Sequence, residues 1–144
     1  MTKPPLADVP IRSADDLTRR WVTVLDPPIF GARSLWVMWL GVDGRMLPIV
    51  MPVDDVPPVP DAVTLAGLRQ VNAGVIAEHL DGEGHLALAL CRPGRPYATH
   101  EDERWAARLH SAFDEELDGT WSLHLAAGGR VSQLVGAPPR IWAR

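Results

Sequence analysis

The chain has 144 residues, of which 47% are hydrophobic and 22% are charged, and its formal net charge at pH 7 is −4. A chain of this size and composition can bury a core of its own, so it needs neither a metal nor a disulfide to fold. The acidic balance argues against the broad basic footprint of a protein that wraps nucleic acid or lies on an anionic membrane, and no apolar run reaches the roughly 18–20 residues of a membrane span.

The first half of the chain predicts a helix followed by a pair of strands. Residues 1–12 are proline-rich and predict an irregular lead-in. Ser13 is typical of a helix N-cap, and an apolar stripe at helical spacing follows it, made by Leu17, Trp21, Val24 and Leu25. The bulky run 34–42 predicts a buried strand, and a tight turn at Asp43-Gly44 leads into a partner strand over 45–52. Pro48 cannot donate to a sheet ladder, so this partner strand should lie at an edge or contain a bulge.

The second half predicts two more helices and three more strands. A helix over 64–80 should turn one stripe inward, made by Leu65, Leu68, Val71, Asn72, Val75, Ile76 and Leu80. The run 85–91 is apolar throughout, which is typical of a central strand buried on both faces. Thr99 with Asp102 has the pattern of a helix N-cap and an acid at the third helical position. Strands over 121–126 and 130–135 close the pattern, joined by a turn at Gly128-Gly129.

The predicted order is therefore α-β-β-α-β-α-β-β. Hairpins and crossovers coexist in this order, which indicates one layered α/β domain over 13–135 with a mixed sheet of about five strands and three helices. Residues 136–144 show no periodicity and predict an irregular tail.

The known catalytic motifs that parts of this sequence resemble each lack a residue that their chemistry requires. His100-Glu101 opens the H-E-x-x-H pattern of zinc hydrolases, but Arg104 stands at the second histidine position. The single cysteine, Cys91, excludes the zinc site of the nucleobase deaminases and any intrachain disulfide, which suits a reducing compartment. Cys91 and His124 could in principle form a nucleophile and base pair, but a buried thiol is the favoured interpretation of Cys91, because free cysteine is among the most buried residue types.

The turn Arg92-Pro93-Gly94-Arg95 is the strongest candidate for binding a ligand. Two guanidiniums beside the start of a helix could hold a phosphate or carboxylate, with Thr99 and Asp102 completing the pocket. Solvated turn arginines are the simpler alternative. A nucleic-acid role would require a larger basic group, Arg92 and Arg95 together with Arg104 and Arg108, and ranks below both.

The tryptophans offer candidate interface residues. Trp36 and Trp39 have opposite parity in the same predicted strand, so they point to opposite faces. If one face is uncovered, the tryptophan on it marks an interface, because tryptophan is enriched at binding hot spots. Trp142, in the aperiodic tail, is the third candidate.

The order of elements from Ser34 to Val135 resembles the JAB/MPN domain in its RadC-like bacterial form, an arrangement also similar to that of small actinobacterial proteins. In metal-dependent members of that family the central strand ends in H-x-H-P, and a Ser/Thr-x-x-Asp follows, so that two imidazoles and one carboxylate hold a catalytic zinc. Here Leu90 and Arg92 stand at the two histidine positions. Thr99 to Asp102 resembles the Ser/Thr-x-x-Asp element, one residue closer to Pro93 than in the family.

The resemblance implies a degenerate member without metal ligands. We therefore expect a non-catalytic, cofactor-free module that binds a protein partner or acts as a scaffold in the cytoplasm, with a homodimer as one arrangement and no role at a membrane. The alternative is an anion- or phosphate-binding domain or enzyme that uses the Arg92-Pro93-Gly94-Arg95 turn.

Overall fold

The computed structural model describes residues 9–117 and 120–136, apart from the side chains of residues 114–117. Within these residues three helices and five strands follow the predicted order, which confirms a single layered α/β domain. The helices are α1 (Ala14–Val24), α2 (Ala62–His79) and α3 (His100–Leu117), and the strands are β1 (Ser34–Leu40), β2 (Met46–Asp54), β3 (His85–Cys91), β4 (Trp121–Ala127) and β5 (Arg130–Val135).

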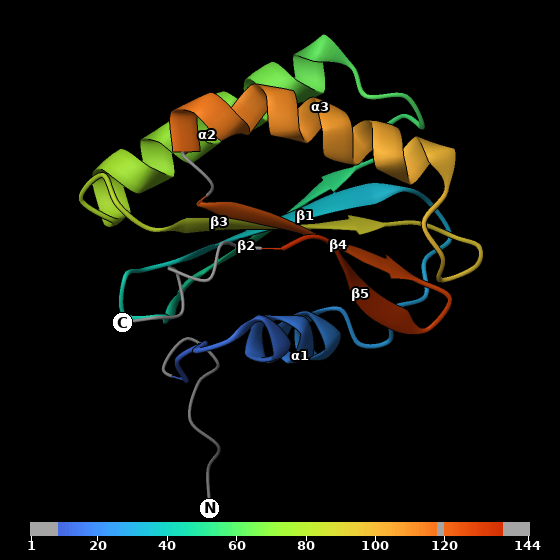
Figure 1. Cartoon of the computed structure of the whole chain (residues 1–144), viewed down its shortest axis with the longest axis horizontal. Helices are drawn as coiled ribbons and strands as arrows, with labels where there is room; N and C mark the ends of the chain where they lie inside the picture. The colour runs from blue at the N-terminus through green and yellow to red at the C-terminus, as the bar shows by residue number, and fades with distance from the viewer. Residues whose placement is uncertain (1–8, 118–119, 137–144) are drawn as a thin grey trace, which may run out of the picture.

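The strands form one mixed sheet in the order β2-β1-β3-β4-β5. β1 pairs antiparallel with β2 and with β3, and β4 pairs antiparallel with β5. β3 and β4 are parallel, and α3 makes the crossover that a parallel pair requires. Figure 1 shows α1 on one face of the sheet and α2 with α3 across the other, so the molecule has three layers.

β3 is the centre of the core, as its continuous apolar run predicts. All seven of its residues are buried. Its leucines point toward α2 and α3, whereas Ala87, Ala89 and Cys91 point toward α1. The small side chains on the second face leave room for Trp21 of α1, which is fully buried against them.

β2 is an edge strand and also contains a bulge, which confirms the prediction from Pro48 of an edge or a bulge. The register between β1 and β2 shifts between Met38 and Leu40, whose partners are Val50 and Met46. Pro48 lies in the resulting bulge, where its missing N–H costs the ladder nothing.

Side chains cap each helix start. Ser13 Oγ accepts from Asp16 N at 3.0 Å, as predicted for α1. α2 begins two residues earlier than expected, because Asp61 caps it by accepting from the Thr64 N–H at 3.2 Å.

Val71, predicted on the inner stripe of α2, is 37% exposed, because one step along a helix turns it about 100° away from the buried Asn72.

Candidate functional site

The two ends of the β3–α3 loop are joined by a buried ion pair. Arg92 follows β3 directly and is only 4% exposed. Its Nε donates to Asp102 Oδ1 at 2.8 Å and to Oδ2 at 3.0 Å, and its Nη2 donates to Oδ2 at 2.7 Å. The planar guanidinium matches a carboxylate in this way, and such charge-assisted bonds are the strong ones.

The same guanidinium also holds the loop backbone. Nη1 donates to the carbonyls of Pro93 and Arg95, each at 3.0 Å, and Nη2 donates to the carbonyl of Tyr97 at 2.8 Å. Every nitrogen of Arg92 therefore has a partner. We call the Arg92–Asp102 pair together with these three carbonyls the loop clamp.

Asp102 is fully buried in the first turn of α3. Its Oδ2 accepts from the Thr99 N–H at 2.9 Å, and Thr99 Oγ1 accepts from the Asp102 N–H at 3.3 Å, which is the predicted capping arrangement. Burial raises the pKa of Asp102, but the bonds from Arg92 and Thr99 outweigh it and hold the pKa below its usual value. Arg33 adds a second cation, with Nη1 3.7 Å from Asp102 Oδ1.

The structure brings Arg92, Thr99 and Asp102 together, but not as an open pocket. The three residues satisfy one another, so the predicted anion site is closed by its own members. Arg95 is exposed and contributes its backbone carbonyl to the clamp. A phosphate at this point would have to displace Asp102 from Arg92, which leaves a buried charge unpaired.

The residues at this position do not fit a zinc ion. Leu90, at the first histidine position of the JAB/MPN resemblance, is a fully buried hydrocarbon facing α2 and α3. Arg92, at the second, is a cation whose donors are all engaged. Neither side chain can ligate a metal.

Cys91 and His124 do not form a nucleophile and base pair. Cys91 is fully buried, and burial raises the pKa of its thiol to about 12. His124 Nε2 lies 2.9 Å from Thr18 Oγ1 of α1. The β3–β4 register pairs Cys91 with Ala126, two residues beyond His124 along β4.

Two histidines, His85 and His124, lie buried beneath α1, and of these only His124 is a candidate site residue on sequence grounds. His124 bonds Thr18, and His85 Nε2 lies 2.9 Å from Ser122 Oγ. Burial lowers the pKa of each histidine to about 4, with the charge of His124 lowering that of His85 further. The only sequence signal that they share a face is their spacing: along β3 and β4 they occupy the positions that alternate with the leucines, which point to the other face of the sheet.

The tryptophan predictions have three different outcomes. Trp39 is fully buried between the sheet and α2, where its Nε1 donates to Asn72 Oδ1 at 3.0 Å, so it presents no surface to a partner and its selection as an interface residue is wrong. Trp36 is half-buried against the cluster under α1. Trp142 lies outside the described residues.

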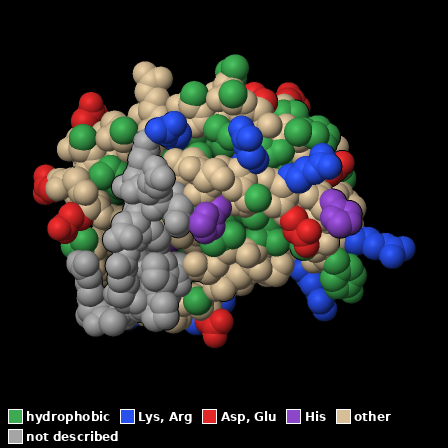
Figure 2. Space-filling model, turned by 45° about the horizontal axis from the view of Figure 1, so that its top comes forward, with side chains coloured by type: hydrophobic (Ala, Val, Ile, Leu, Met, Phe, Trp, Pro, Cys, Tyr) green, Lys and Arg blue, Asp and Glu red, His purple; other side chains and the backbone are tan. Residues whose placement is uncertain are grey.

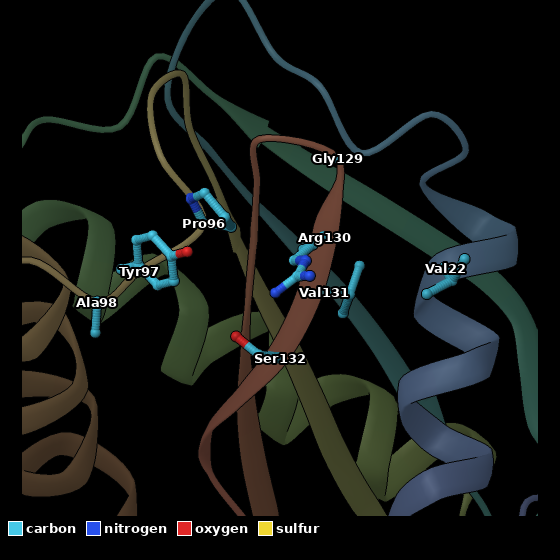
Figure 3. A pocket seen from close by; sticks show the side chains of 8 residues that line it. All are labelled: Val22, Pro96, Tyr97, Ala98, Gly129, Arg130, Val131 and Ser132. Carbon is cyan, nitrogen blue, oxygen red and sulfur yellow. The ribbon is translucent and has the colours of Figure 1, made fainter.

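A shallow groove that the sequence analysis also missed runs along β5, with a volume of about 660 Å³. Figure 3 shows Pro96, Tyr97 and Ala98 on one side, Val22 of α1 on the other, and β5 between them. The β5 residues in it are Arg130, Val131 and Ser132, with Gly129 at the turn.

The loop clamp positions one wall of this groove. Its carbonyl bonds hold Arg95 and Tyr97 on either side of Pro96. The loop rests on the β4–β5 turn at Gly128, where an added Cβ would come 2.8 Å from Pro96 Cδ and 3.0 Å from the Gly94 carbonyl oxygen. Clamp, loop and turn therefore form one unit.

The described side chains on the outer side of α2 and α3 carry charges of both signs. Figure 2 shows the arginines of this side interspersed with acids and histidines. The basic group considered for nucleic acid does not assemble there, because Arg92 is buried in the clamp.

Among the described side chains, those of residues 9–113 and 120–136, no three His, Cys, Asp or Glu gather as a metal site would require. No helix within residues 9–117 and 120–136 has both the length and the apolar character to cross a membrane. A scan of the chain against models of protein families gives no match, and a search among curated proteins gives none either.

Proposed function

We propose that this chain is a metal-free binding module with a JAB/MPN-like fold, which contacts another protein and catalyses no reaction. The observation that carries the proposal is the loop clamp. At the position where the resemblance implies zinc ligands, a buried arginine holds a buried carboxylate and three loop carbonyls. This arrangement uses the site to fix a loop instead of binding a metal.

The alternative of an anion-binding domain receives less support. Its main donor would be Arg92, whose nitrogens are all occupied. Of the two arginines on that turn, Arg95 is exposed and Arg92 is buried. A small free anion held by one exposed guanidinium alone binds weakly, because water screens the attraction and no main-chain pairing adds to it.

The proposal places the module in the cytoplasm. The one cysteine of the chain, Cys91, is a free buried thiol, which suits a reducing compartment. A homodimer is one form that such a module could take, and nucleic acid is not its expected partner.

Metal analysis of the purified chain tests the proposal. The protein is prepared without chelators, incubated with excess zinc, desalted and analysed for bound metal. We expect far less than stoichiometric zinc and no rise in melting temperature on adding it. Tightly bound stoichiometric zinc would contradict a metal-free module.

A phosphate titration tests the alternative in the same thermal assay. We expect no phosphate-specific rise in melting temperature beyond that produced by chloride at equal ionic strength. A rise that disappears in Arg95→Ala would instead favour the anion-binding domain.

A further inference from the structure

We propose that the free edge of β5 binds an extended, acidic peptide segment of a partner protein as a sixth strand of the sheet. This inference rests on the proposed binding function and names its surface and the chemistry of its partner. β-strand addition uses main-chain hydrogen bonds for affinity and alternating side chains for specificity.

The two edges of the sheet differ in how they are protected. β2 carries Pro48 and Pro52 and a bulge, all devices that blunt an edge against further pairing. β5 has the sequence RVSQLV, with no proline, and among the residues that the structure describes it pairs only with β4. The shift in its pairing with β4 lies at the Leu123 end, away from Arg130–Ser132. β5 is thus the edge that remains able to accept a strand.

The groove has a wall on each face of the sheet. Pairing of Ala127 with Arg130 and of Leu125 with Ser132 places Arg130 and Ser132 on the α2/α3 face, beside the loop that carries Tyr97. Val131 packs on the α1 face, with Val22 nearby. Tyr97 is 66% exposed and Val22 is 41% exposed, so both present apolar surface to an added strand.

The charge of the groove selects the occupant. Arg130 is exposed and is the only charged residue among the eight that line it. A strand added here turns alternate side chains to the two faces. The matching peptide therefore has acidic residues toward Arg130 and apolar residues toward Val22 and Val131.

A second copy of the chain fits this edge less well. Pairing of β5 with β5 would offer Arg130 only the side chains of RVSQLV, none of which is acidic. The acidic partner peptide is therefore the occupant that charge complementarity favours.

A labelled peptide tests the proposal on the full chain. The probe is a fluorescein-labelled hexapeptide of alternating Glu and Val, which matches the six residues of β5. We expect saturable binding by fluorescence anisotropy, with NMR amide shifts centred on β5, Tyr97, Ala98 and Val22. A Lys-Val hexapeptide should bind at least about tenfold more weakly, and an N-methylated Glu-Val hexapeptide should lose binding because it lacks N–H donors.

Arg130→Glu should weaken the Glu-Val peptide roughly tenfold, because an attraction becomes a repulsion. The matched control is Arg108→Glu, the same change at an exposed position on α3. Equal effects of the two variants, equal binding of the N-methylated peptide, or amide shifts away from β5 would overturn the proposal.

A second copy on the edge would also overturn it. Sedimentation equilibrium without peptide would then show a dimer, and the amides of β5 would be protected from exchange. Stoichiometric zinc would refute the binding module itself, whereas peptide failure in a zinc-free protein would refute only the choice of the β5 edge.

Discussion

The side chain of Arg92 neutralises the charge of Asp102 and also donates hydrogen bonds to three backbone carbonyls of the loop. Arg92→Met should lower the free energy of unfolding by about 3–5 kcal/mol, since it removes the cation that hydrogen-bonds the buried carboxylate and leaves only Arg33, at 3.7 Å. The measurement is urea unfolding followed by tryptophan fluorescence at neutral pH.

Two further variants isolate the ion pair. Arg95→Met, in the same turn but exposed, should stay within about 0.5 kcal/mol of the parent. Arg92→Met with Asp102→Leu should lose less stability than Arg92→Met alone, because no unpaired charge remains. If Arg92→Met were as mild as Arg95→Met, the clamp would not support the loop.

His85 and His124 should make the fold sensitive to mild acid. Their pKa values are about 4 in the folded chain, below the ordinary value of 6.5 that the unfolded chain regains. Between pH 6.5 and pH 4 these two histidines are therefore protonated in the unfolded chain but not in the folded chain. Their contribution to stability is complete above pH 6.5 and falls by up to about 1.4 kcal/mol per pH unit for each histidine as the pH drops toward 4.

Urea unfolding at a series of pH values measures this slope. His124→Gln should flatten it by about half, because one of the two buried rings is then removed. NMR titration of the parent gives a direct check. A folded-state pKa near 6.5 for either buried ring would contradict the prediction.

At the scale of elements, the contact between the β3–α3 loop and the β4–β5 turn requires a residue without a side chain at Gly128. Gly128→Ala should cost roughly 1–3 kcal/mol, because its Cβ would meet the backbone of Gly94 and the ring of Pro96 at a positive φ of 57°. Gly129→Ala is the matched control, with a positive φ of 84° but no atom within 4 Å of the added Cβ. Urea unfolding should rank Gly128→Ala as the more damaging, with amide shifts reaching Tyr97; the reverse ranking would show that the loop does not rest on the turn.

The elements themselves were readable from the sequence, because local signals and hydrophobic pattern agree. Ser13, the Asp43-Gly44 turn and the apolar run of β3 each predict the element that the structure contains. Pro48 even indicated the edge and the bulge.

The candidate site could be predicted only in part from the sequence. Arg92 and Asp102 were correctly selected as neighbours of one loop, but whether two such groups hold a ligand or each other depends on how the loop folds between them. Likewise the parity of Trp36 and Trp39 separates them, but only the placement of α2 shows that Trp39 is the one covered. The groove is formed by α1, the β3–α3 loop and β5, and no local sequence pattern predicts that these three segments lie side by side.

At the scale of the whole molecule, one strand serves two cores. The residues of β3 alternate between the cluster facing α2 and α3 and the cluster facing α1. Neither cluster can loosen without exposing the other side of the same strand. We therefore expect one cooperative unfolding transition, although α1 is a single short helix on its face.

Substitutions on opposite faces test this coupling. Leu17→Ala removes packing under α1 and Leu109→Ala removes it under α3, and each should lower the free energy of unfolding by about 2–5 kcal/mol, since both leucines are buried. Val63→Ala, at a position 81% exposed, should be nearly neutral. In all three variants the far-ultraviolet and near-ultraviolet circular dichroism transitions should coincide. A first transition in Leu17→Ala that releases α1 while the rest stays folded would mean that the shared strand does not couple the two faces, because the sheet would then survive with one face bare.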